Sequence, residues 1–242
     1  MLIKNTSISI KYNKIDNLKR KFFHNEDLMR EFFNEASVLP IPDDAPPEIP
    51  RIIIKSFNEH SQLNISPIAS TLQISYNDGF ERDWKSCKRY IRQKMGVVFS
   101  LLNVLTNNVY EYIGVVAEVL LDEHMNNGAQ ILAQNLLKNS DLSVYDLNIK
   151  YTFIKNDNTF VNIMLQNARL FQNNINTDIA GDLSPANQVS ESISAIIDIN
   201  DRYGYNTCID YKSDSSQLEH ILDEMAVVMN NKLKGLLEKG EY

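Results

Sequence analysis

Three carboxylates and a lysine in the last quarter of the chain have the residue types of a metal-dependent nuclease. Asp198 and Asp201 lie at the end of a predicted strand, and Asp210-Tyr-Lys212 follows shortly after. Such nucleases hold Mg²⁺ with strand carboxylates and use a nearby lysine in orienting the attacking water. The spacing permits this chemistry, although similar spacings are frequent by chance. These four residues are therefore the catalytic candidates of an alternative function, a Mg²⁺-dependent nuclease.

Cations gather on one face of a helix predicted over 80–105. They are Arg82, Lys85, Lys88, Arg89, Arg92 and Lys94, offset only by Glu81 and Asp83. Nucleic-acid phosphates or an acidic partner protein would bind such a face. An ordinary solvent-exposed helix face would have the same composition. We take Arg82, Lys85, Lys88, Arg89 and Arg92 as candidate anion- or partner-binding residues.

The sequence predicts no metal site and no cofactor. Cys87 and Cys208 are far apart and belong to no Cys/His cluster. His220 has helical ligand spacing to Glu219, Asp223 and Glu224, but a solvent-facing charged stripe explains this group better. The glycine-rich, serine-hydrolase and zinc-protease motifs are absent from the sequence, which disfavours the common nucleotide enzymes.

Composition predicts a folded protein of a reducing compartment. The 242 residues are 43% hydrophobic and 23% charged, as in ordinary globular domains. The net charge of −7 disfavours a surface that binds nucleic acid or an anionic membrane throughout. No run of residues has the apolar length of a signal peptide or a membrane span. We expect a cytoplasmic protein without a membrane partner.

The elements expected in the first part of the chain are read from apolar spacing and turn residues. They are a strand at 3–10, a helix from an N-cap at Asp16 to about Ser37, strands at 51–58, 63–66 and 71–76, and the helix over 80–105. Trp84 and Cys87 lie on the apolar stripe of that helix and should be buried. Between the first helix and the strands, five of the seven prolines fall in 39–50. We expect this proline-rich arm to be extended, either as a connector packed along the surface or as a segment that docks on a partner.

The second part of the chain gives a similar set of elements. They are a buried central strand at 109–121 with a bulge at Gly114, a short helix at 128–138, a hairpin at 145–168, a polar mobile loop at 171–190, a strand at 193–200, and a helix at 214–238 capped near Ser213 or Asp214. Three strands followed by one long amphipathic helix thus occur twice. The predicted fold class is α+β, with mainly antiparallel sheet and long amphipathic helices packed on one face. We expect a single module, and two related halves at 1–122 and 123–242 are left open.

Two resemblances follow from these patterns. Pro46-Pro-Glu-Ile-Pro-Arg51, the strands Leu63-Asn-Ile-Ser66 and Leu72-Gln-Ile-Ser75, and the helices from Trp84 and Leu218 resemble a sporadically distributed, uncharacterised prokaryotic family. That family supplies no catalytic residues to transfer. The hairpin, loop, strand and helix of the last part look like the arrangement of SecB-like export chaperones and their toxin–antitoxin relatives. This second resemblance implies the holding of unfolded chains on exposed apolar grooves.

The leading expectation is therefore a non-enzymatic cytoplasmic binding or assembly component. It would be chaperone-like or part of a prokaryotic stress or phage-defence system, with a protein partner. Nucleic-acid binding through the basic helix face and self-association into an oligomer are left open. Loss of Mg²⁺-dependent DNA cleavage on Asp210→Ala would support the nuclease alternative instead.

Overall fold

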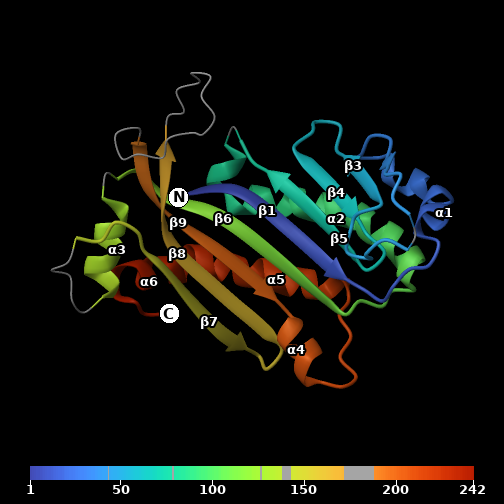
Figure 1. Ribbon diagram of the computed structural model, residues 1–242. Coiled ribbons are helices and arrows are strands. Elements are labelled where there is room, and N and C mark those ends of the chain that lie inside the picture. The colour runs from blue at the N-terminus through green and yellow to red at the C-terminus, as the bar shows by residue number, and fades with distance from the viewer. Residues whose placement is uncertain (43, 78, 126, 138–142, 172–187) are drawn as a thin grey trace.

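One antiparallel sheet of nine strands organises the protein. The computed structural model describes residues 1–242 except 43, 78, 126, 138–142 and 172–187. The strands lie in the order β2-β3-β4-β5-β1-β6-β9-β8-β7 (Figure 1), and every neighbouring pair is antiparallel. Their bounds are β1 Leu2–Lys11, β2 Ser37–Val38, β3 Ile52–Lys55, β4 Ser61–Ile65, β5 Ala69–Ser75, β6 Tyr112–Met125, β7 Asn148–Lys155, β8 Thr159–Phe171 and β9 Gln188–Asn200. The predicted α+β class with antiparallel sheet is confirmed.

The main helices lie behind the sheet in the view of Figure 1. The helical elements are α1 Leu18–Phe23, η1 Glu26–Met29, η2 Phe80–Arg82, α2 Trp84–Thr106, α3 Gly128–Leu136, α4 Arg202–Thr207, α5 Ser215–Val227, the π-helical turn η4 Val228–Lys232 and α6 Leu233–Lys239. The helices expected at 80–105, 128–138 and 214–238 are thus present as α2, α3 and the run α5, η4 and α6. In the described part of the chain, no helix combines the length and apolar character needed to cross a bilayer.

Aspartates begin the two helices that matter most for the site. The Asp83 side chain accepts hydrogen bonds from the backbone N–H groups of Lys85 and Ser86, and Asp214 accepts one from Ser216. These bonds satisfy donors that the first helical turn leaves free. Hydrogen bonds from the neighbouring serine hydroxyls are the main reason that the pKa values of both carboxyls lie below their usual range.

The core lies between the helices and one face of the sheet. Alternate strand residues are buried there, which follows from the two-residue period of a strand. They include Ile8, Ile10, Leu63, Leu72, Ile74, Val115, Ala117, Val161, Ile163, Ile197 and Ile199. Trp84 and Cys87 of α2 are buried against this layer as predicted. Burial raises the pKa of the Cys87 thiol to about 12, so this cysteine stays protonated and unreactive.

The hairpin of β7 and β8 follows the predicted pattern. The two strands pair from Asn148 opposite Gln166 to Lys155 opposite Thr159. Asn156 and Asp157 have positive φ in the turn, a conformation that Asn and Asp tolerate better than most residues. The predicted loop at 171–190 has its ends in strands, because β8 extends to Phe171 and β9 begins at Gln188. The remainder of that loop, 172–187, lies outside the described residues.

The helix expected from Asp16 to Ser37 is wrong in most of its length. Asn17, with φ 54°, precedes α1, which ends at Phe23. After η1 the chain is extended: Phe33 bridges to Ser56, and β2 pairs with β3. Pairing with the edge of the sheet outweighs the helical spacing of Phe22, Met29 and Phe33, which are buried without a continuous helix.

The central strand β6 also departs from expectation in two details. Its pairing with β9 is irregular between Leu120 and Met125, and the register is regular at Gly114. A side chain at Gly114 would place its Cβ 3.0 Å from the Cβ of Asn200, so close strand approach accounts for this glycine. The boundary expected at 122/123 falls inside β6.

The proline-rich segment 39–50 connects β2 to β3 and wraps around one side chain. Arg51 is 1% exposed, and its guanidinium donates to the backbone carbonyls of Ile49, Ala45 and Pro46. The Ala45 N–H donates to the Pro42 carbonyl, and the Ile49 N–H donates to the Pro46 carbonyl. The segment is therefore a connector folded onto the surface, with Arg51 as its internal support.

Candidate functional site

Two cations of the predicted basic face bind carboxylates of α5. Lys88 forms an ion pair with Asp223 and a longer one of 3.8 Å with Glu219. Arg92 binds Glu219 with two nitrogens, Nε at 2.9 Å and Nη2 at 2.6 Å. The hydrogen bond to Glu219 raises the pKa of Arg92 above its ordinary value. We call these four residues the α2–α5 seam.

The seam leaves three of the candidate cations without an ion pair in the described ranges. Arg82, Lys85 and Arg89 are solvent-exposed, and no ion pair joins them to another residue in the described ranges. Lys88 is 8% exposed and is therefore a structural residue of the helix interface. The sequence could not indicate the pairing, because 135 positions separate Lys88 from Asp223.

Lys94, the sixth cation of the face, is enclosed by aromatic rings. Its Nζ lies 4.8, 5.1 and 5.3 Å from the ring centroids of Phe32, Phe33 and Tyr90, and donates to the Phe32 carbonyl oxygen at 3.1 Å. Loss of water around the amine lowers the pKa of Lys94, while Tyr90 acts in the opposite direction. The side chain thus holds the segment after η1 against α2.

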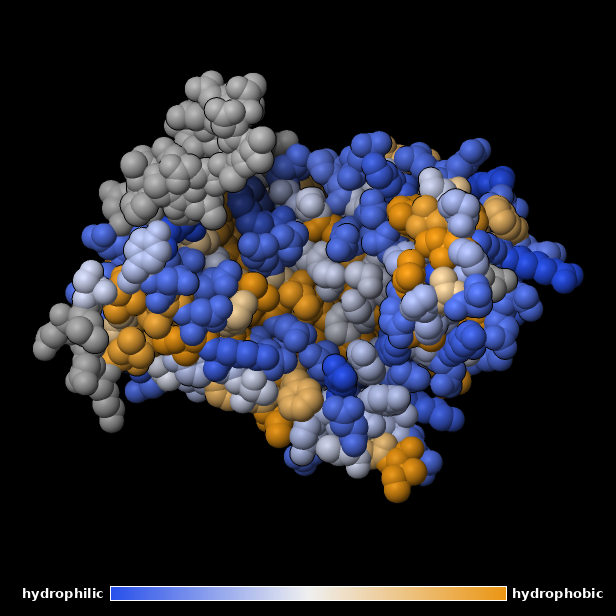
Figure 2. Space-filling model, in the orientation of Figure 1, coloured by the Kyte–Doolittle hydropathy of each residue, from blue (hydrophilic) through white to orange (hydrophobic). Residues whose placement is uncertain are grey.

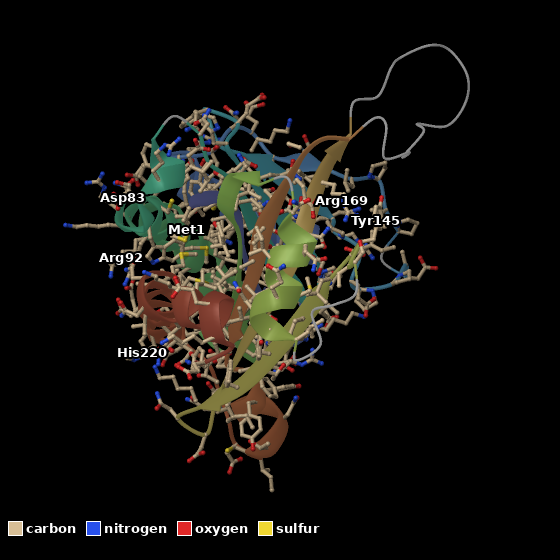
Figure 3. All side chains as sticks on the ribbon, turned by 90° about the vertical axis from the view of Figure 1, so that its left-hand side faces the viewer. Met1, Asp83, Arg92, Tyr145, Arg169 and His220 are labelled. Atoms are coloured by element: carbon tan, nitrogen blue, oxygen red, sulfur yellow. The ribbon has the colours of Figure 1, made fainter. Side chains whose placement is uncertain are left out.

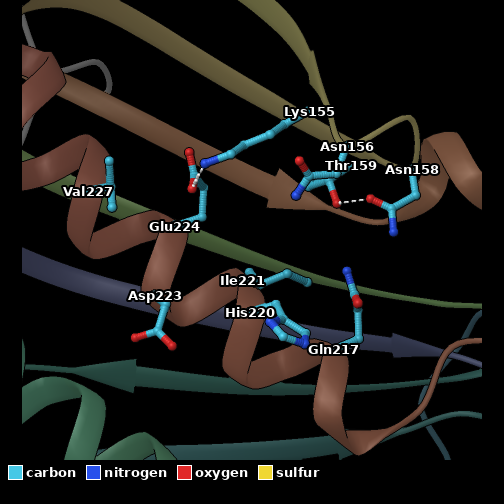
Figure 4. A pocket seen from close by; sticks show the side chains of 10 residues that line it. All are labelled: Lys155, Asn156, Asn158, Thr159, Gln217, His220, Ile221, Asp223, Glu224 and Val227. Carbon is cyan, nitrogen blue, oxygen red and sulfur yellow. Dashed lines mark hydrogen bonds and ion pairs between the residues drawn. The ribbon is translucent and has the colours of Figure 1, made fainter.

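A polar pocket of about 420 Å³ lies between the turn of β7 and β8 and helix α5 (Figure 4). It is lined by Lys155, Asn156, Asn158, Thr159, Gln217, His220, Ile221, Asp223, Glu224 and Val227. Lys155 forms an ion pair with Glu224 across the pocket, and Thr159 donates to Asn158 at 2.8 Å. His220 and Arg92 lie on the helix side of the molecule (Figure 3).

The pocket offers amide groups, one histidine and an ion pair, which suits the binding of a small polar group. In the part of the chain that the structure describes, no group of three or more His, Cys, Asp or Glu residues is placed to hold a metal ion. His220 is exposed, and the neighbouring Asp223 is engaged with Lys88. The predicted charged stripe on this helix is therefore largely the seam and the rim of the pocket.

Asp201, one of the nuclease candidates, is buried as a structural carboxylate. It is 0% exposed and accepts hydrogen bonds from the backbone N–H of Ile113 at 2.6 Å, the Tyr211 hydroxyl at 2.7 Å and the Ser213 hydroxyl. Burial raises the pKa of Asp201, and these hydrogen bonds oppose the rise. The carboxylate joins the end of β9 to β6 and to the residues that precede α5.

The other nuclease candidates lie apart from Asp201. Asp198 is on β9 and accepts from the side-chain amides of Asn162 at 3.2 Å and Asn200 at 2.9 Å. Asp210 and Lys212 are exposed in the connection between α4 and α5. None of the three carboxylates shares a hydrogen-bonding partner with another within the described ranges. The structure does not assemble them into one site.

The sheet face opposite α2 and α5 is turned toward the viewer in Figure 1, with the main helices behind the sheet. Two cross-strand rows form what we call the uncovered face: Ser7, Val116, Asp198, Asn162 and Thr152, and beside them Asn5, Glu118, Ile196, Met164 and Lys150. Their carboxylates are satisfied by neighbouring amides, as in the bond of 2.7 Å from Asn5 to Glu118. Figure 2 shows hydrophobic and hydrophilic side chains intermixed on this side.

Helix α4 bounds the uncovered face at one end. The Tyr203 ring of α4 packs on Phe160 at 5.1 Å, and Tyr205 packs on Tyr112 at 5.6 Å. At the other end of the strands, the Arg169 guanidinium lies 3.8 Å from the ring centroid of Tyr145, and both residues are labelled in Figure 3. This surface could not be predicted from the sequence, because strand order rather than local pattern decides which rows meet.

A second hollow of about 720 Å³ lies beside β3. Its walls include the exposed rings of Phe23 and Phe57, which are 54% and 60% exposed, and the buried side chains of Met29 and Phe33. Exposed aromatic rings beside a hollow are typical of surfaces that contact other proteins.

No protein-family model matches the chain, and no curated protein matches it.

Proposed function

We propose that the protein is a non-enzymatic cytoplasmic component that binds segments of other proteins, in a chaperone-like role. The uncovered face is the observation that carries this proposal. It places half-buried apolar side chains, Val116, Ile196 and Met164, among amides, hydroxyls and a few charged side chains. Such a mixture suits unfolded segments, which present both apolar side chains and unpaired backbone groups. A prokaryotic stress or phage-defence system would use such an activity.

We also propose that the chain consists of two related halves that meet at the centre of the sheet. The order β3-β4-β5-β1 in the first half has the same sequence of elements as β7-β8-β9-β6 in the second. In each half the last strand in chain order, β5 or β9, leads through a short helical element, η2 or α4, to a long helix with an aspartate cap. This correspondence supports a boundary between α2 and β6.

The correspondence supports the resemblance to SecB-like chaperones as well. Each half would contribute a four-stranded antiparallel sheet with one long helix on it, and the second half contains the hairpin, strand and helix on which the resemblance was based. The uncovered face would then be the equivalent of an apolar client groove.

The nuclease alternative has less support. Its carboxylates do not converge, and Asp201 is committed to three internal hydrogen bonds. The basic face is reduced to Arg82, Lys85 and Arg89 by the α2–α5 seam. No observation on the described residues favours nucleic acid over protein as the ligand.

Aggregation of a denatured client tests the proposed function. Reduced, denatured lysozyme is diluted into buffer with and without the protein, and light scattering is followed. We expect the wild-type protein to suppress scattering and the double variant Met164→Ser/Ile196→Ser to bind the client about tenfold more weakly, because apolar contact area is lost.

A matched control removes an exposed apolar residue from the helix side. Val104 on α2 is 55% exposed, so Val104→Ser should leave suppression unchanged. Equal suppression by the double variant and the wild type would refute the role of the uncovered face. No suppression by the wild type would refute the chaperone-like function itself.

A further inference from the structure

The outer edge of β7 is a free sheet edge. β7 is the last strand of the sheet, and it pairs with β8 on one side only. The Asn167 N–H donates to the Leu147 carbonyl in the same register. This bond shows that the backbone groups of the odd-numbered residues of β7 point toward β8. Because backbone groups of an antiparallel strand alternate in direction, those of residues 148, 150, 152 and 154 point away from β8. No backbone hydrogen bond reaches them from the described residues.

The corresponding edge in the first half is occupied. Strand β3 holds the equivalent place in the strand order, and the chain's own segment 33–39 lies along it. Asn34 donates its N–H to the Lys55 carbonyl and Leu39 donates to the Arg51 carbonyl, each at 2.8 Å. The protein therefore satisfies one outer edge with an extended segment and leaves the other without one among the described residues.

The side chains of β7 indicate what kind of segment would fit. Residues 148–155 include Lys150 and Lys155 and no acidic residue. Lys155 is neutralised by Glu224, whereas Lys150 is exposed and has no ion pair in the described ranges. A second copy of β7 would bring further lysines to this edge, so charge favours a different, acidic strand.

The helix-facing side of the edge is aromatic. The Tyr151 and Phe153 rings are nearly parallel, and the Phe153 ring stacks on Tyr242 with centroids 4.0 Å apart. A strand added beside β7 would place every other side chain next to this row. Apolar side chains at those positions would extend the aromatic layer, and the intervening positions would face Lys150.

We propose that the outer edge of β7 binds an extended segment of a partner protein by antiparallel strand addition. The segment has apolar residues at alternate positions and an acidic residue beside Lys150. The inference rests on the proposed function in taking a protein segment as the ligand; the binding groups are the backbone groups at the edge of β7, where Lys150 and Thr152 also belong to the uncovered face. Segment 33–39 shows that the opposite edge of the same sheet accepts an extended segment.

Hydrogen exchange measured by NMR with a defined peptide tests the site. The probe is a short capped peptide in which valine alternates with threonine, with one central glutamate. In the free protein the amides of residues 150, 152 and 154 should exchange rapidly, while those of 151 and 153 are protected by β8. Saturation with the peptide should slow the outward amides by about tenfold or more. No added protection at these positions would overturn the proposal.

Two variants test the contacts separately. Thr152→Pro removes an outward N–H without touching the β8 ladder, so it should weaken peptide binding by about tenfold, whereas Thr152→Val should bind as the wild type does. Lys150→Glu should reverse the preference between the glutamate peptide and a lysine version. Unchanged binding in both Thr152→Pro and Lys150→Glu would overturn the proposal.

Sedimentation and client binding separate this inference from other outcomes. A dimer of the free protein that Thr152→Pro converts to monomer would assign the edge to a second copy and overturn the partner segment. Ile154→Pro, which removes another outward N–H at a residue outside the two rows of the uncovered face, should still suppress client aggregation, and Met164→Ser/Ile196→Ser should still bind the peptide. These measurements thus distinguish a failure of the proposed client binding on the uncovered face from a failure of the proposed strand addition at the β7 edge.

Discussion

The indole N–H of Trp84 on α2 donates to the backbone carbonyl of Leu222 on α5 across a distance of 3.3 Å. These residues are 138 positions apart, and the bond lies beside the seam of Lys88, Arg92 and the α5 carboxylates. It ties together the two helices that the proposed halves contribute.

Trp84→Phe tests how much this bond contributes. The variant keeps an aromatic ring in the core but removes the donor and part of the buried area, so we expect a loss of about 1–2 kcal/mol in the free energy of unfolding. Trp84→Ala should cost about 3–5 kcal/mol. Urea unfolding followed by circular dichroism measures both. If Trp84→Phe loses as much free energy of unfolding as Trp84→Ala, the expectation that packing of the ring contributes separately from the hydrogen bond is contradicted.

Asp201→Ala should destabilise the protein by about 3 kcal/mol, because the buried N–H of Ile113 loses its acceptor. Asp201→Asn should cost less, since the amide oxygen still accepts from Ile113 and the two hydroxyls can rotate to accept from the amide nitrogen. Both variants remove the charge of Asp201, but only Asp201→Asn keeps hydrogen-bonding groups at this position. Equal losses would mean that these hydrogen bonds contribute little.

The raised pKa of Asp201 also predicts a pH effect of definite sign. The folded state binds the proton more tightly than the unfolded state, whose pKa is near 3.8. The stability of the wild type relative to Asp201→Asn should therefore be greatest at or below that pH and fall as the pH rises through the folded pKa. Urea unfolding of both proteins from acid to neutral pH measures the difference. A difference that grows with pH would contradict the raised pKa.

Lys94→Met should change the free energy of unfolding by no more than about 1 kcal/mol, because methionine keeps the apolar stem among the rings and removes a poorly hydrated charge. Lys94→Glu should cost about 3 kcal/mol or more, since an anion would face three ring faces and the Phe32 carbonyl. Thermal and urea unfolding give both values. If Lys94→Met is as harmful as Lys94→Glu, the cation itself holds the rings in place.

Gly204→Ala should destabilise the protein by about 1–3 kcal/mol although alanine favours helix. Its Cβ would lie 2.6 Å from Cε2 of Tyr211 and 3.1 Å from Cβ of Asn158. The Tyr211 ring cannot move freely, because its hydroxyl donates to Asp201. In a Tyr211→Ser background the ring is gone, and the same glycine substitution should be nearly neutral. A double-mutant cycle without coupling would contradict the clash.

Local signals predicted the parts of the fold that depend on neighbouring residues. Asp83 and the apolar spacing from Trp84 onward are sufficient to locate α2, and the turn at Asn156 and Asp157 with alternating flanks is sufficient for the hairpin. The helix predicted over the segment from His24 to Val38 was wrong for the opposite reason. The conformation of this segment is imposed by pairing with the edge of β3, a strand that comes later in the chain.

The candidate site was less predictable than the fold. Lys88 and Arg92 were identified as cations, but their partners on α5 could not be read from the sequence because the packing of two distant helices decides them. Asp201 was singled out for chemistry, whereas the structure uses it to join β6 to the approach to α5. The free edge of β7 had no sequence signal at all, since strand order determines it.

The pairing of β1 with β6 at the centre of the sheet also constrains the order of folding during synthesis. Ile8 meets Val115, so one side of β1 stays unpaired until nearly half of the chain has left the ribosome. β6 in turn waits for β9, where Ile197 meets Ala117. Such distant pairings are slow to form and leave strand edges exposed meanwhile. A nascent chain of this protein therefore passes through stages in which it is itself prone to aggregation.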